Sequence, residues 1–66
     1  GRDAARDAAL AHAGVALTDT YELEVEEELD ERTPCYKVEF KAGGMEYEYK
    51  IDARTGGVLT YEMDRD

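Results

Sequence analysis

The chain has 66 residues and a formal net charge of −9 at pH 7, from 17 acidic and 8 basic side chains. This charge repels nucleic-acid phosphates and anionic lipid surfaces, so we expect no nucleic-acid partner. The acidity fits either a solvated surface or a basic protein partner, and the sequence does not separate the two. Hydrophobic residues make up 42% of the chain, so it can fold, and its length predicts one domain over residues 1–66 without a buried catalytic cleft.

The N-terminal segment has the pattern of a short helix. From Asp3 to Ala13 the sequence is rich in alanine, and the apolar side chains recur at helical spacing. Asp3 is suited to the N-cap, and Gly14 stands where a left-handed C-cap residue is expected. Small alanine side chains allow a β-sheet to approach the helix closely, so we expect the helix to lie on a sheet.

The rest of the chain alternates with a period of two, which is typical of strands. The breaks contain proline or paired glycines and predict three or four antiparallel strands: Tyr21 to Leu29, Cys35 to Ala42, Met45 to Asp52 and Val58 to Met63. Glu27 interrupts the first alternation and is a candidate bulge or exposed end. We expect the Asp52 carboxylate to accept backbone N–H bonds in the last loop, and the tail from Asp64 to Asp66 to fray.

These elements predict an α+β fold in which one N-terminal helix covers one face of the antiparallel sheet, with glutamates and lysines on the other face. No residue pattern indicates a catalytic, cofactor or metal site, and we expect a domain that is not an enzyme. His12, the single histidine, is expected to contact the helix C-terminus or solvent. Cys35 falls on the polar strand face and is interpreted as an incidental thiol.

The first and last strands of a meander are its edges, and an exposed edge can bind a partner strand. The acidic side chains of the first strand discourage pairing with strands of other molecules, and the last strand is less protected in this way. Tyr21 is not constrained to the core by the alternation and is a further candidate anchor, since tyrosine is enriched at interfaces. The candidate interaction edge therefore consists of Leu59, Tyr61, Met63 and Tyr21.

Two motifs make the chain similar to the PepSY family. The segment from Tyr36 to Phe40 has the sequence Tyr-Lys-Val-Glu-Phe, and the segment from Ile51 to Leu59 has Ile-Asp-Ala-Arg-Thr-Gly-Gly-Val-Leu, at the usual spacing of the family. Arg6 and Cys35 depart from the residues common at those positions. The resemblance covers nearly the whole chain and implies a cystatin-like roll with no known catalytic residues.

The resemblance also implies a function and a location. It implies protein binding, with restraint or regulation of a peptidase as the proposed activity of the family. It further implies an extracytoplasmic location, in a bacterial cell envelope or secreted, within a longer parent protein that would supply any membrane anchor. The alternative is a structural spacer, a sensor module or a self-associating unit that forms a homodimer.

Overall fold

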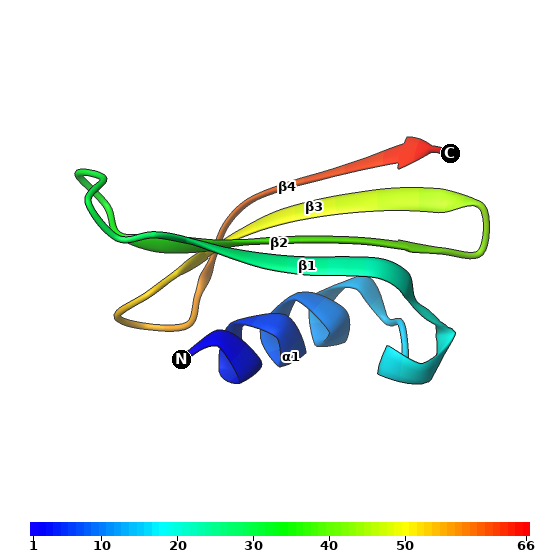
Figure 1. Cartoon of the computed structure of the whole chain (residues 1–66), viewed down its shortest axis with the longest axis horizontal. Coiled ribbons are helices and arrows are strands. Elements are labelled where there is room, and N and C mark those ends of the chain that lie inside the picture. The colour runs from blue at the N-terminus through cyan, green and yellow to red at the C-terminus, as the bar shows by residue number, and fades with distance from the viewer.

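The alternating residues after Gly14 form four strands that pair in chain order, and the N-terminal helix lies on one face of the resulting sheet (Figure 1). This is the computed structural model of residues 1–66. The sheet has the order β1-β2-β3-β4, so β1 and β4 are its two edges. The α+β fold predicted from the sequence is confirmed. The elements are α1 (Arg2–Ala13), a 3-10 helix (Leu17–Asp19), β1 (Tyr21–Glu28), β2 (Cys35–Ala42), β3 (Met45–Asp52) and β4 (Val58–Arg65).

Helix α1 ends as its sequence predicts but begins differently. Gly14 adopts the left-handed conformation, with φ of 73°, and closes the C-terminus. At the other end Gly1 is the N-cap and no side chain caps the helix, so the prediction of Asp3 as N-cap is wrong. The reason is that the Ala5 N–H already donates to the Gly1 carbonyl, at 3.0 Å, which places Asp3 inside the first turn. There its negative charge interacts favourably with the positive N-terminal end of the helix dipole.

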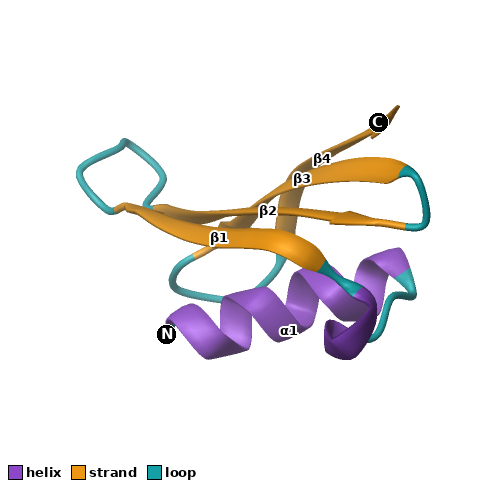
Figure 2. Cartoon of the chain, turned by 45° about the vertical axis from the view of Figure 1, so that its right-hand side comes forward, coloured by secondary structure: helices purple, strands orange, loops and turns teal.

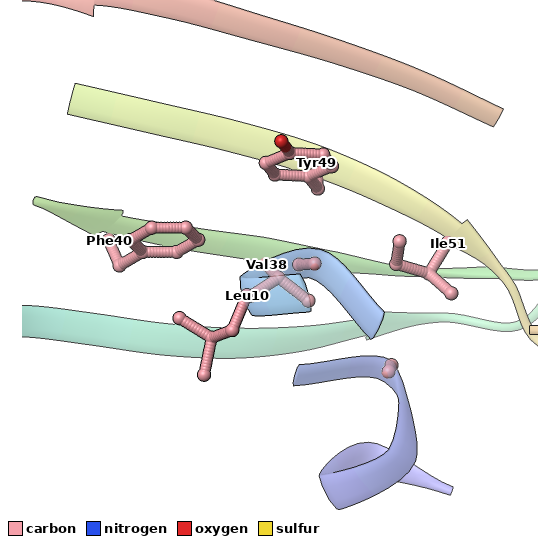
Figure 3. Packing of buried hydrophobic residues seen from close by; sticks show 7 residues of the cluster. Leu10, Val38, Phe40, Tyr49 and Ile51 are labelled. Carbon is pink, nitrogen blue, oxygen red and sulfur yellow. The ribbon is translucent and has the colours of Figure 1, made fainter. Parts of the chain in front are cut away.

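The core lies between α1 and the central strands. Leu10 of the helix packs with Val38 and Phe40 of β2 and with Tyr49 and Ile51 of β3 (Figure 3). All five side chains are buried. Two alanines of α1, Ala5 and Ala9, complete this cluster and let the helix backbone lie close to the sheet.

The β2–β3 hairpin sets the register of the sheet. Gly43 and Gly44 have φ of 57° and 78°, values that a two-residue hairpin of the primed type requires and that glycine adopts without strain. Ala42 consequently pairs with Met45, and the apolar side chains of β2 and β3 meet on the face that α1 covers.

The irregularity of β1 lies at its start. The register shifts between Tyr21 and Glu24, and Glu22 has a φ of 52°. Glu27 pairs with Tyr36 in regular register, so the candidate bulge at Glu27 is wrong, whereas the alternative of an exposed end is confirmed, since Glu27 is exposed one residue before β1 ends. The Glu27 carboxylate binds Arg2 of α1 there, at 3.1 Å.

The C-terminal tail is ordered, which corrects the prediction that it frays. Strand β4 continues to Arg65, and the Asp66 N–H donates to the Gly44 carbonyl at 2.9 Å. The Asp66 carboxylate also lies 3.3 Å from Lys41 Nζ and accepts a hydrogen bond from the Tyr21 hydroxyl. The tail is therefore held by contacts with segments far away in the sequence.

The loop between β3 and β4 follows its sequence prediction. The Asp52 carboxylate accepts hydrogen bonds from the N–H groups of Arg54 and Thr55, at 2.7 and 3.2 Å. Gly56 takes the left-handed conformation with φ of 77°. The N–H bonds, that of Arg54 above all, lower the pKa of the Asp52 carboxyl below its ordinary value.

Enlarging Ala9 should test how closely the helix and the sheet are packed. Ala9 is fully buried, so Ala9→Leu is expected to destabilise the fold by about 1 to 3 kcal/mol through overpacking. Ala11→Leu makes the same change on the exposed side of α1 and should leave stability nearly unchanged. Urea unfolding measures both variants, and equal midpoints would contradict this account of the core.

Replacing Asp52 should change how stability depends on pH. Because the pKa of Asp52 is lowered in the folded state, its contribution is present above the ordinary carboxyl value of 3.8 and is lost as the pH falls through the folded value. Asp52→Asn keeps an oxygen acceptor but removes the charge. The difference in unfolding free energy between the two proteins should therefore shrink on acidification from neutral pH, whereas a constant difference would show that the charge contributes nothing.

Candidate interaction surface

Strand β4 is the strand of the sheet that the helix covers least. Helix α1 packs on β1, β2 and β3, and Figure 2 shows β4 as the strand farthest from it. Tyr61 pairs with Tyr49 and Met63 with Tyr47, so the side chains of Tyr61 and Met63 lie on the same face as the helix. They are 56% and 55% exposed. Two large apolar side chains are thus presented to solvent beside the core.

Leu59 adds to the exposed apolar residues of β4 for a local reason. The register shifts so that Ile51 pairs with Val58 and Lys50 with Thr60, which leaves Leu59 unpaired in a bulge. Leu59 is 42% exposed. The bulge explains why Val58 and Leu59 are both apolar although they are adjacent in a strand.

The backbone of β4 is also available at the same place. The Asp66 N–H donates to the Gly44 carbonyl, one position beyond the last pair of β3 and β4. Hydrogen-bonded and non-hydrogen-bonded pairs alternate along antiparallel strands, so even-numbered residues of this part of β4 bond to β3. The N–H and C=O groups of Tyr61 and Met63 therefore point away from β3, toward the open side of the sheet.

Tyr21 lies apart from the other three candidate residues. It is 46% exposed, but it belongs to β1, the opposite edge, and pairs with Lys41 on the face away from the helix. Its hydroxyl donates to the Asp66 carboxylate at 3.3 Å. Desolvation and then the neighbouring Asp66 raise the pKa of Tyr21. The predicted edge residues thus divide into a β4 group and a separate tyrosine.

The β1 edge is protected by side chains. Arg2 of α1 donates to the Val25 carbonyl at 2.6 Å and binds Glu27 at 3.1 Å. The irregular backbone at Glu22 further interrupts this edge. Such features discourage pairing with another strand. Of the two edges, β4 is therefore the accessible one.

His12 contacts the sheet, whereas the sequence predicted a contact with the helix C-terminus or with solvent. Its Nδ1 lies 2.9 Å from the Tyr49 hydroxyl, and its ring centroid lies 4.7 Å from that of Tyr61. Burial, followed by the neighbouring tyrosines, raises the pKa of Tyr49. The available signal was the spacing of His12 three residues after Ala9, which places it beside the sheet-facing stripe. His12 thereby joins the helix to β3 and β4.

Cys35 is buried, with only 4% of its surface exposed, although it lies on the strand face where its neighbours are charged. Its thiol lies 3.6 Å from a carboxylate oxygen of Glu28. Burial and then Glu28 raise the pKa of Cys35, which favours the thiol over the reactive thiolate. The Ala53 N–H donates to the Pro34 carbonyl beside it, a contact that closes this end of the sheet.

The face opposite the helix is strongly acidic toward β4. One row of paired residues crosses all four strands and contains only glutamates: Glu24, Glu39, Glu48 and Glu62. Lys37 binds Glu39 at 3.5 Å, and Glu39 and then Glu48 raise the pKa of Lys37. Lys41 binds Glu22 at 3.0 Å and Asp66 at 3.3 Å. Both lysines belong to β2, and neither forms an ion pair with Glu62 or Asp64 of β4.

The chain has no group of three or more histidine, cysteine or acidic side chains placed to hold a metal ion. None of its helices has the length and hydrophobicity needed to span a membrane.

Comparison with known proteins identifies one family. The family model PepSY, described as peptidase propeptide and YPEB domain, matches residues 1–62. No curated protein and no solved structure matches the chain significantly. The match covers the helix and β4 as far as Glu62, so of the exposed apolar residues of β4 it includes Leu59 and Tyr61 but not Met63.

The contact between His12 and Tyr49 should contribute measurably to stability. Tyr49→Phe removes only the hydroxyl, and the loss of its hydrogen bond is expected to cost about 1 kcal/mol. Unfolding free energies of Tyr49→Phe, His12→Ala and the double variant form a thermodynamic cycle. The double variant should lose less than the sum of the single losses, and strictly additive losses would show that the two side chains are not coupled.

Proposed function

The chain belongs to the PepSY family, and from this premise we propose that it is a non-catalytic protein-interaction domain that receives an extended partner segment at strand β4. One observation carries the proposal. Tyr61 and Met63 combine exposed apolar side chains with backbone groups directed away from the sheet. In strand addition the backbone supplies hydrogen bonds and alternate side chains supply specificity, so both requirements are met at one place.

The partner we propose is a peptidase that this domain restrains or regulates, in the cell envelope or outside the cell. The support is the family description, which includes peptidase propeptides. A domain with an open strand edge can engage an extended segment of such an enzyme by strand addition. A membrane, where one is involved, would be reached through an anchor elsewhere in the parent protein.

The same exposed residues support a second candidate function, a self-associating structural or sensor module. Two copies could pair their β4 edges and cover Tyr61 and Met63 in a twofold arrangement. Sedimentation over a wide concentration range separates the two candidates. A monomer at all concentrations favours a different protein as the partner, and a dimer weakened by changing Tyr61 favours self-association.

Replacing Tyr61 should weaken partner binding without unfolding the domain. Tyr61→Lys places a charge where the proposed contact needs an apolar surface, and we expect about a tenfold loss of affinity for extended peptides selected by display on the native chain. Tyr21→Lys is the matched control, because it makes the same change at an exposed tyrosine on the other edge. Circular dichroism should show that both variants stay folded.

Two results would contradict this function. One is that display enriches no extended peptide on the native chain. The other is that the enriched peptides bind both tyrosine variants equally well, which would exclude β4. The peptidase role has a separate readout, since the native chain should slow a purified secreted peptidase that recognises it, and Tyr61→Lys should do so less effectively than Tyr21→Lys.

A further inference from the structure

We propose that the segment received by β4 alternates apolar and basic residues, with its apolar side chains over Tyr61 and Met63 and its basic side chains beside Glu62 and Asp64. This inference rests on the proposed strand addition and specifies the chemistry of the partner. It follows from the different character of the two faces of β4. A strand added beside β4 would continue both faces, because its successive side chains point to opposite sides of the sheet.

A strand added beside β4 would meet an apolar surface on the side of the sheet that carries the helix. Tyr61 stacks on Tyr49, with ring centroids 5.6 Å apart, and Met63 pairs with Tyr47. An added strand would lie about 4.8 Å from β4, so its side chains on this face would contact Tyr61 and Met63 directly. These side chains are more than half exposed. An apolar neighbour would remove their surface from water without burying an unpaired polar group.

The other face of the new position is acidic, and the cation of this face on the neighbouring strand, Lys50 of β3, lies opposite Thr60 and forms no ion pair with Glu62 or Asp64. Glu62 and Asp64 are exposed and form no ion pair, and their neighbours on β3 are Glu48 and Glu46. The cations of this face that bind acids are Lys37 and Lys41 of β2, two strands away. Basic side chains directly across from Glu62 and Asp64 would form favourable cross-strand pairs, whereas acidic ones would be repelled.

A second copy of the chain does not have this chemistry. An antiparallel twofold pairing that aligns Tyr61 with Met63 of the other copy places Glu62 opposite its own counterpart. Like charges directly opposite each other are unfavourable, and each copy carries a net charge of −9. In this register the charges therefore favour a different, basic segment over a second copy as the complementary strand.

Two defined peptides test this inference on the intact chain. Both are capped and about eight residues long, the usual length of a strand. One alternates valine with lysine and the other alternates valine with glutamate. Fluorescence anisotropy at physiological salt should show that the native chain prefers the lysine peptide by at least about tenfold, and a scrambled valine and lysine peptide should bind more weakly.

Charge-reversed variants separate a local effect from general attraction to an acidic protein. The double variant Glu62→Lys with Asp64→Lys should invert the preference, so that the glutamate peptide binds more tightly. Glu24→Lys with Glu26→Lys changes the net charge equally but lies on β1, and it should retain the preference for lysine. Retention of that preference in both double variants would overturn the inference, because the attraction would then not depend on β4.

A proline variant distinguishes failure of this inference from failure of the proposed function. Met63→Pro removes an N–H that points away from β3 and should weaken peptide binding while sparing the β3–β4 ladder. If both peptides bind equally and Met63→Pro weakens both, strand addition stands and the basic pattern is wrong. If neither peptide binds the native chain, the proposed strand addition and the inference both fail.

Discussion

The width of a single helix is the constraint on which this structure depends. A helix is about 10 Å across, whereas the outer two of four strands spaced about 4.8 Å apart lie roughly 14 Å from each other. Helix α1 is seated by Ala5 and Ala9 over the central strands, so it covers β4 least. The exposure of Tyr61 and Met63 is a geometric result of covering a four-stranded sheet with one helix.

The aromatic residues extend the core toward the least covered strand. Phe40, Tyr47, Tyr49 and Tyr61 form a series of stacked neighbours that runs from β2 to β4. His12 contacts two of these rings and ties the end of α1 to them. Tyr61 is therefore held in position by stacking on Tyr49, while more than half of its surface stays exposed to solvent. An interaction surface needs this combination, because a side chain that is already ordered loses little conformational entropy on binding.

The sequence predicted the parts of this fold that depend on neighbouring residues. Alternation located β2 and β3, paired glycines located their hairpin, and the bonds of Asp52 followed from its place before a glycine loop. The errors arose where distant segments meet. The tail of β4 is ordered by Gly44 and Lys41, and Glu27, which forms no bulge, binds Arg2 of α1. The alternation of residues along β4 was enough to choose Leu59, Tyr61 and Met63. That Tyr21 lies on the opposite edge and the opposite face follows only from the strand pairing of the folded chain.

The acidity of the chain has consequences that depend on where the charges lie. Sequence alone did not separate a solvated surface from a basic partner as the reason for a net charge of −9. In the folded chain Lys37 binds Glu39 and Lys41 binds Glu22 and Asp66, while Glu62, at the end of the row of glutamates on the open edge, forms no ion pair. Like charges in register oppose folding, so stability alone does not favour this arrangement. A basic strand beside β4 would relieve the repulsion, and the charge pattern therefore favours a partner at the same edge that the exposed tyrosine and methionine mark.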